Sequence, residues 1–362
     1  MRLQPMIFSR LKRILKTNKP SQRLVGDRGF TLVELLVTAL VASGILSGLL
    51  FLTNELLRSD ERESNRTETQ RDMQLALDFI SSELREAIYI YEADCLDGTD
   101  PECPGLTTAN GNNLGLPNDY IPVLAFWKLE PLPENVKNDC AGVNAAGEAL
   151  ANPPDISNKI FCLAGNYYSL IVYSIGFPDA ANGYDAIETD TAAPLDFRGR
   201  AALFRSAMVI EDKDADGYIS PLESQKPRFR SWPSTDANPD VWPSTDAPVF
   251  ETRALIDFVD DGANDPAALD DTLLCDVDGD GSPNPEYVVT PTGNVPRSFY
   301  ACVNTNRLTD VEDNTSGTYF GNQDVILYLR GNAAGRSGLM TGNSFLPTLE
   351  SRVFVRGAID RP

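Results

Sequence analysis

The fold of this chain is decided by the stretch Gly29-Phe30-Thr31-Leu32-Val33-Glu34-Leu35-Leu36-Val37-Thr38-Ala39-Leu40. It opens an apolar run from Phe30 to Leu52 that carries a single charge, Glu34. As a helix rising 1.5 Å per residue, this run would be roughly 35 Å long, which is enough to cross a bilayer core. An acid inside such a span costs about 3 kcal/mol on insertion scales, so Glu34 needs a compensating partner.

Cleavage between Gly29 and Phe30 would supply that partner. The new α-amino group of Phe30 would lie one helical turn from Glu34. Glu34 would also lie at the amino-terminal end of the helix, where the helix dipole favours an acid. In an assembly, Glu34 of one subunit would pair with the amino group of the next.

This arrangement resembles the class III signal of type IV pilins and pseudopilins, and Thr31-Leu32-Val33 also fits the family pattern. The resemblance covers about the first 60 residues. It implies that a prepilin peptidase cuts after Gly29 and methylates Phe30, and that Glu34 guides docking into a growing filament. The alternative is a plain membrane anchor, which would gain nothing from the acid.

The distribution of charge predicts the topology of the chain. The 362 residues include 31 Lys+Arg and 52 Asp+Glu. Residues 1–29 hold eight of the basic residues and one acid, so their removal leaves 23 basic against 51 acidic residues, a net charge of −28. Basic residues before the span keep the N-terminus cytoplasmic and export everything after Leu52. The acidic mature surface disfavours nucleic acid and anionic lipid as partners.

A classical cleaved secretory signal fits this N-terminus less well. Its apolar core has 7–15 residues, and its cleavage site follows that core rather than preceding it. We therefore expect a single-pass protein of the inner (cytoplasmic) membrane, with its head in the periplasm or outside the cell.

Six cysteines all fall in the exported part of the chain, which agrees with an oxidising compartment and three disulfides. Six cysteines allow 15 pairings. Sequential pairs close the shortest loops and are favoured here: Cys95–Cys103, Cys140–Cys162 and Cys275–Cys302. The chain has no C-x-x-C pair, so thiolate metal sites are not expected.

The chain contains no histidine, which excludes Ser-His-Asp and Cys-His catalysis and His-ligated zinc. A hydrolase with paired carboxylates is the enzymatic alternative that this composition leaves open. No motif supports it, so we expect no enzymatic activity.

The residues after the membrane span favour one long helix. No proline occurs between Pro20 and Pro101, and no glycine between Gly48 and Gly98, so the sequence predicts a helix from Phe30 to about Tyr91. Its second half, residues 53–91, carries an apolar stripe at spacings of three and four that would pack on a folded head. The stripe is Met73, Leu77, Ile80, Leu84, Ile88 and Tyr91. Gly44 and Gly48 form a small-residue face, either for packing between stems or incidental to the membrane helix.

Residues 92–362 read as an exported, disulfide-bearing head rich in β-structure. β-Branched and aromatic runs separated by loops rich in Gly, Pro, Asn and Asp predict six strands. These are 120–127, 167–177, 201–210, 298–303, 324–330 and 352–359. The expected fold class is α+β and type IV pilin-like: a long N-terminal helix packed on an antiparallel sheet with large loop insertions.

One acidic stretch has the spacing of an EF-hand calcium loop. A hard cation takes six to eight oxygen ligands, and short carboxylates alternating along a loop can wrap it. Gly217 at the sixth position permits the sharp turn. The expected ligands are Asp212, Asp214, Asp216, Tyr218 (through its carbonyl), Ser220 and Glu223. An ordinary acidic turn is the alternative.

A second acidic stretch matches the same pattern less closely. Asp276, Asp278 and Asp280 take the first three ligand positions, but Glu286 comes one place early and Tyr287 stands at the twelfth position. Calcium is the only cofactor that the sequence predicts.

These features predict a minor pilin or pseudopilin, a structural subunit of a filament in a type IV pilus or related secretion apparatus. Its expected partners are other pilins through the N-terminal helix, the prepilin peptidase and the membrane. The long basic leader and the large acidic head also resemble the pseudopilins of cyanobacterial hormogonium polysaccharide secretion, which would make polysaccharide the cargo. The alternative is a calcium-stabilised adhesin or glycan-binding pilus tip that uses Trp232 and Trp242, two tryptophans in a repeated surface motif.

Overall fold

The computed structural model describes about half of the chain. The described residues are 30–97, 106, 120–150, 165–177, 201–209, 249–262, 274–276, 284–293, 295–304, 323–333, 336 and 346–355. The chain divides into two compact units, Met1–Leu57 and Arg58–Pro362.

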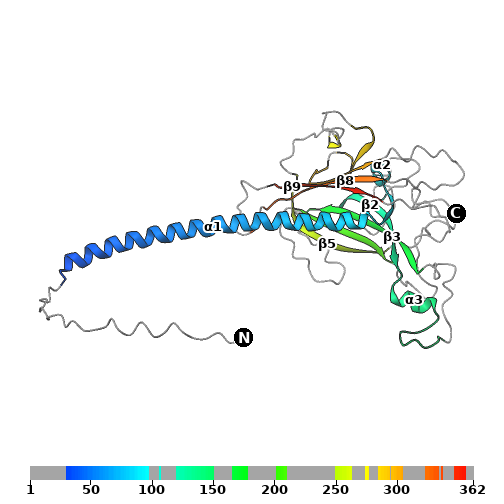
Figure 1. Ribbon diagram of the computed structural model, residues 1–362, viewed down its shortest axis with the longest axis horizontal. Helices are drawn as coiled ribbons and strands as arrows, with labels where there is room; N and C mark the ends of the chain where they lie inside the picture. The colour runs from blue at the N-terminus through cyan, green and yellow to red at the C-terminus, as the bar shows by residue number, and fades with distance from the viewer. Residues whose placement is uncertain are drawn as a thin grey trace, which may run out of the picture. The chain divides into compact units, whose positions relative to one another are not determined.

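The longest element is the helix α1, which runs over 53 residues from Leu32 to Leu84 (Figure 1). Thr31 precedes it, and the Thr31 carbonyl accepts hydrogen bonds from the backbone N–H groups of Glu34 and Leu35 at 3.0 and 3.2 Å. The absence of proline lets the backbone ladder continue without a break. The division between the two units falls within this helix.

The prediction that the helix continues to Tyr91 is wrong. The helix ends at Leu84, and the strand β1 (Ala87–Ile90) follows at once. Ile88 and Tyr91 continue the helical spacing of the stripe, but β1 pairs antiparallel with β2 (Tyr120–Pro131). Over so few residues, pairing with a neighbouring strand overrides helical periodicity.

The first sheet has five strands in the order β1-β2-β3-β4-β5, and each neighbouring pair is antiparallel. β3 spans Asn166–Gly176, β4 spans Ala201–Val209 and β5 spans Val249–Val259. Two short helices, α2 (Ala93–Asp97) and α3 (Glu134–Cys140), lie between the strands in sequence. The strand order follows the chain order, so the sheet is a simple meander.

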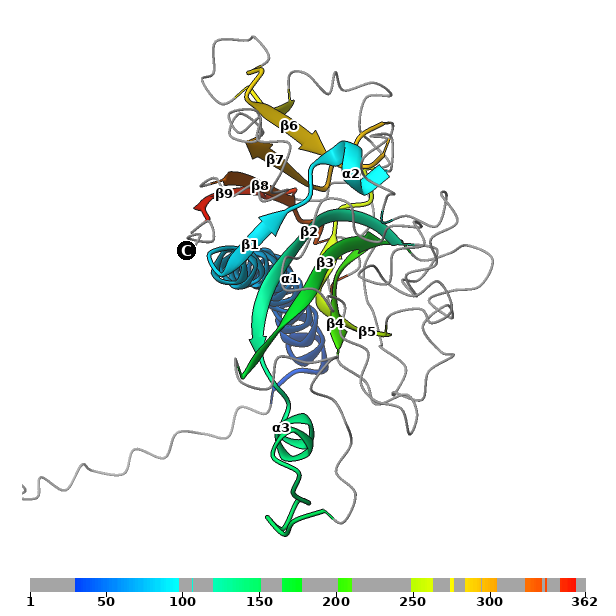
Figure 2. The same ribbon diagram turned by 90° about the vertical axis from the view of Figure 1, so that its right-hand side faces the viewer.

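The second sheet has four strands in the order β6-β7-β8-β9, again all antiparallel. They are β6 (Tyr287–Thr290), β7 (Phe299–Asn304), β8 (Asp324–Arg330) and β9 (Thr348–Phe354). An isolated bridge between Val259 and Gly331 connects the two sheets. Figure 2 shows the two sheets of the second unit around the carboxyl-terminal part of α1, which belongs to the same unit.

The core of the second unit lies where α1 meets both sheets. Burial of the helix begins at Thr69, and the apolar stripe from Met73 to Leu84 packs with residues of both sheets. A Cβ atom on Gly331 would lie 2.3 Å from the Met73 sulfur, so a larger residue at this contact would force the Met73 side chain to move. The non-directional gain from burying apolar surface supplies most of the adhesion between helix and sheets.

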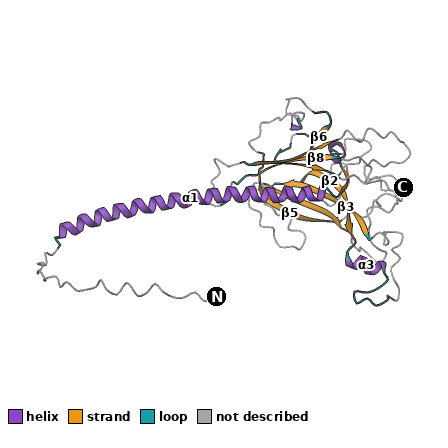
Figure 3. Cartoon of the chain, in the orientation of Figure 1, coloured by secondary structure: helices purple, strands orange, loops and turns teal. Residues whose placement is uncertain are grey.

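The structure confirms the α+β layout of a long N-terminal helix with antiparallel sheets (Figure 3). Each of the six predicted strands overlaps an observed strand, whereas β1, β5 and β6 were missed. The disulfide Cys275–Cys302 is formed as predicted. Cys95 and Cys140 are also disulfide-bonded. Cys103 and Cys162, their predicted partners, lie outside the described residues.

Candidate functional site

The first candidate site is the start of α1. The Thr31 hydroxyl accepts a hydrogen bond from the Glu34 backbone N–H at 3.3 Å, so Thr31 caps the helix and places Glu34 in its first turn. The Glu34 side chain is exposed, and within the described part of the chain its carboxylate has no hydrogen-bond or ion-pair partner. Phe30 is 78 % exposed. Gly29, on the other side of the predicted cleavage point, lies outside the described residues.

From Leu35 to Leu52 the helix carries no charged residue, and all of these residues are exposed. It is long and apolar enough to cross a membrane, although a signal sequence near an N-terminus would pass the same test. Three of its hydroxyl side chains are satisfied within the helix. Thr38, Ser43 and Thr53 donate to backbone carbonyls three or four residues earlier at 2.8–2.9 Å. Internal satisfaction of polar groups is what a hydrocarbon environment requires.

The small-residue face of this helix is open in the single chain. A Cβ atom added to Gly44 or Gly48 would have nothing within 4 Å. The space is therefore available to a second helix at close approach, which is how small residues act in membrane helices.

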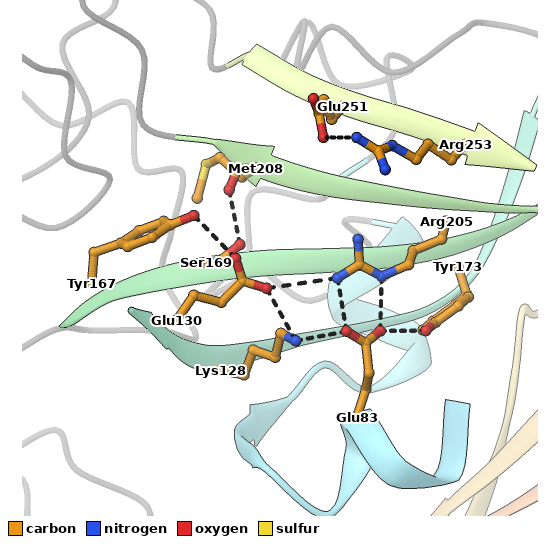
Figure 4. Close-up of polar contacts among 10 residues, drawn as sticks. All are labelled: Glu83, Lys128, Glu130, Tyr167, Ser169, Tyr173, Arg205, Met208, Glu251 and Arg253. Atoms are coloured by element: carbon orange, nitrogen blue, oxygen red, sulfur yellow. Dashed lines mark hydrogen bonds and ion pairs between the residues drawn. The ribbon is translucent and has the colours of Figure 1, made fainter. Parts of the chain in front are cut away.

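The second candidate site is a buried charged cluster around Glu83, in the last turn of α1 (Figure 4). Lys128 on β2 donates from Nζ to Glu83 Oε1 at 2.6 Å. Arg205 on β4 donates from Nη2 to Oε1 at 2.7 Å and from Nε to Oε2 at 2.8 Å. The hydroxyl of Tyr173, on β3, donates to Glu83 Oε2. Three neighbouring strands thus hold one carboxylate of the helix.

A second carboxylate completes the cluster. Glu130 lies 3.0 Å from Lys128 Nζ and 3.6 Å from Arg205 Nη2, and it accepts a hydrogen bond from the Tyr167 hydroxyl at 3.0 Å. Two acids therefore face two bases, and their formal charges balance. Such balance is the condition under which buried charges are tolerated.

The surroundings fix the charge of each member. Burial alone would raise the pKa of Glu83, but hydrogen bonds from Arg205, Lys128 and Tyr173, together with the Arg205 charge, lower it to about 2. Burial would lower the pKa of Lys128, and its contacts with Glu83 raise it instead. Burial and the neighbouring Glu83 charge raise the pKa of Tyr173 well above its usual range. At neutral pH Glu83, Lys128 and Arg205 are ionised, and Tyr173 is a neutral donor.

This cluster was not among the predicted sites. Glu83 stands at helical spacing from Ile80 and beside Leu84, and so falls on the buried stripe. Lys128 directly follows the apolar run that ends at Trp127. A charged residue within an apolar pattern is the signal that would have found both, because such residues are buried only when paired.

Most of the predicted calcium ligands lie outside the described residues. Asp212, Asp214, Asp216, Tyr218, Ser220 and Glu223 all lie outside them, as do Asp278, Asp280, Trp232 and Trp242. Asp276 and Glu286 are described, and the Glu286 backbone N–H donates to Asn284 Oδ1 at 3.0 Å. Within the described ranges, no three His, Cys, Asp or Glu side chains are grouped to hold a metal ion.

No protein-family model, curated protein or solved structure matches this chain. Its function is therefore argued from its own residues and from the motif at the start of α1.

Proposed function

We propose that this protein is a minor pilin or pseudopilin, a membrane-anchored structural subunit that assembles through its N-terminal helix. One observation carries the proposal: Glu34 stands exposed in the first turn of α1, at the start of an apolar run that ends at Leu52. The prepilin-type signal at Gly29 and Phe30 supports it.

The exposed carboxylate of Glu34 supports a role between subunits. An ionised side chain in a lipid-embedded helix is expensive and is normally paired. Within the described residues this carboxylate has no partner in its own chain. The amino group of a cleaved Phe30 on a neighbouring subunit has the charge that would neutralise it.

A plain membrane anchor makes a different prediction for the same residue. In an anchor, Glu34 would serve only the helix terminus, where Thr31 already caps the backbone. Loss of the carboxylate would then ease membrane insertion and leave assembly unaffected. The two functions therefore differ in what Glu34→Ala changes.

The test is to compare Glu34→Ala with Glu55→Ala in cells that contain the prepilin peptidase and the partner pilins. Glu55 is an exposed acid of the same helix, beyond the apolar run. Both variants should insert into the membrane, as shown by extraction with detergent but not with carbonate. Only Glu34→Ala should be lost from sheared or cross-linked filaments. Equal incorporation of the two variants would contradict the docking role of Glu34.

For the machine, we propose a type IV pilus-like or secretion filament, with polysaccharide as the candidate cargo. The large head supports an accessory subunit over the bulk building block, because the residues after 92 number about 270. We also propose that the loop from Asp212 to Glu223 binds calcium, on the strength of its ligand spacing.

A further inference from the structure

The apolar stripe of α1 specifies which face of the helix is buried, but it leaves the axial position weakly defined. Its members recur at spacings of three and four, so a slide of four residues would put Leu77 in the place of Met73 and Leu84 in the place of Ile80. Residues one turn apart lie on the same helix face. Since apolar attraction is non-directional, much of the buried contact would survive such a slide.

The Glu83 cluster does not survive it. A slide of four residues in one direction would bring Phe79 to the position that Glu83 occupies, and in the other direction it would bring Ala87, which belongs to β1 beyond the end of the helix. Lys128 and Arg205 would then lose the carboxylate that both of them bind. Buried charges without a partner are among the most destabilising changes in a protein interior.

Glu83 also stands at the wrong end of the helix for its charge. The carboxyl end of a helix dipole disfavours an acid, and the last turn of α1 holds no basic residue to offset it. The helix alone gains nothing from Glu83. The residue is favourable only when the helix meets the five-stranded sheet in the observed position.

The other polar contacts between this helix and the rest of the head are less suited to fix its axial position. Arg336 pairs with Glu68 and Asp72 at 2.7 Å, but the Glu68 side chain is 58 % exposed and solvent screens the pair. Ser81 Oγ lies 3.0 Å from Ser351 Oγ on β9, a contact between two neutral hydroxyls. The charged contact with the greatest burial is the one at Glu83, where both Glu83 and Lys128 are 9 % exposed in their side chains.

We propose that the Glu83 cluster is a register lock, which fixes the axial position and rotation of α1 on the head and excludes positions one turn away. One-turn displacement of one element past another is an established form of conformational switching. Here the ion pairs with Lys128 and Arg205 are satisfied in one position only. The proposal concerns the head alone and stands whether or not the stem assembles into a filament.

The register can be read out by engineered disulfides in the full chain. The pair Ser81→Cys with Ser351→Cys reports the native position, because the two hydroxyls are 3.0 Å apart. Asp78→Cys or Arg85→Cys with Ser351→Cys reports a slide of about one turn in either direction; both positions are exposed, and Arg85 directly follows the helix. Each pair is placed in the native background, in Glu83→Met and in Glu86→Met, and disulfide-linked peptides are quantified by mass spectrometry after mild oxidation.

The native background and the Glu86→Met control should form the 81–351 disulfide and neither of the displaced ones. Glu83→Met should lose most of the 81–351 disulfide and gain one of the displaced pairs. If Glu83→Met keeps the 81–351 disulfide at the native level, with no displaced pair, the proposal is overturned.

The single variant leaves two bases facing only Glu130, with one positive charge uncompensated, and so is at risk of not folding. The variant Glu83→Met, Lys128→Met, Glu130→Met, Arg205→Met removes all four charges of the cluster, and apolar replacement of a buried ion cluster commonly preserves stability. It should fold and still form a displaced disulfide. Only native disulfides in this folded variant, or its complete failure to fold, would overturn the proposal, because the cluster would then act in stability and not in register.

Discussion

Arg205 on β4 donates from Nε and Nη2 to the two carboxylate oxygens of Glu83 in the last turn of α1, at 2.8 and 2.7 Å. The two residues are 122 positions apart in the sequence. A bidentate pair fixes both the distance and the relative orientation of its partners. The end of the long helix is thereby attached to an interior strand of the five-stranded sheet.

Glu83→Gln should lower the free energy of unfolding by about 3 kcal/mol. The amide keeps the size of the side chain but removes one of the two carboxylates that balance Lys128 and Arg205, so one positive charge of the cluster is left uncompensated. Urea unfolding of the full chain in detergent micelles, followed by tryptophan fluorescence, measures the change, because Trp127 is fully buried. The control Glu86→Gln alters an exposed acid of the adjoining turn and should shift stability by less than about 0.5 kcal/mol. Equal losses in both variants would show that the ion pairs contribute nothing specific.

Head stability should fall in acid because of Glu83. Its pKa lies at about 2 in the folded chain, below its ordinary value of 4.5. A carboxyl with a depressed pKa stabilises the fold fully above its unfolded pKa and loses that stabilisation as pH falls through its folded pKa. The loss should therefore run from about pH 5 to about pH 2 and amount to about 3 kcal/mol.

The pH dependence can be assigned by mutation. In Glu83→Gln, the free energy of unfolding should depend less on pH over this range. Part of the slope should remain, because hydrogen bonds from Tyr287 and Arg352 outweigh burial and lower the pKa of Asp324 as well. An unchanged slope in Glu83→Gln would mean that Glu83 does not titrate as its contacts indicate.

Calcium should raise the melting temperature of the chain, and Asp212→Ala with Glu223→Ala should abolish that rise. A ligand that binds only the folded state stabilises it in proportion to the logarithm of its free concentration. Differential scanning fluorimetry in calcium and in chelator measures the effect. The control Glu61→Ala with Glu63→Ala removes the same charge from exposed positions of α1 and should keep the full calcium response. If the native chain melts at one temperature in both buffers, the loop does not bind calcium.

Patterns of consecutive residues were sufficient to predict the helices and strands whose conformation is set by their own sequence. The uninterrupted apolar run predicted α1, and runs of β-branched and aromatic residues predicted strands such as β8. β5 was missed because Glu251, Arg253 and Asp257 interrupt its apolar pattern. Pairing with β4 along most of its length nonetheless makes it a strand.

The two candidate sites also differ in whether their residues are neighbours in the sequence. The motif at Gly29, Phe30 and Glu34 lies within six consecutive residues and is legible from the sequence. The Glu83 cluster depends on partners that are 45, 90 and 122 positions away. The sequence marks the individual charged residues as unusual, but only the antiparallel register of β2, β3 and β4 brings them to one place.

The most direct test of the proposed function is the mass of the N-terminus of the mature protein. The chain is expressed in cells with an active prepilin peptidase, extracted from the membrane with detergent and analysed by mass spectrometry of its N-terminal peptide. The result expected is an N-methylated Phe30 at the N-terminus, with the apolar helix intact. An unprocessed Met1 terminus, or a secreted chain that has lost the apolar helix, would contradict assembly through this helix.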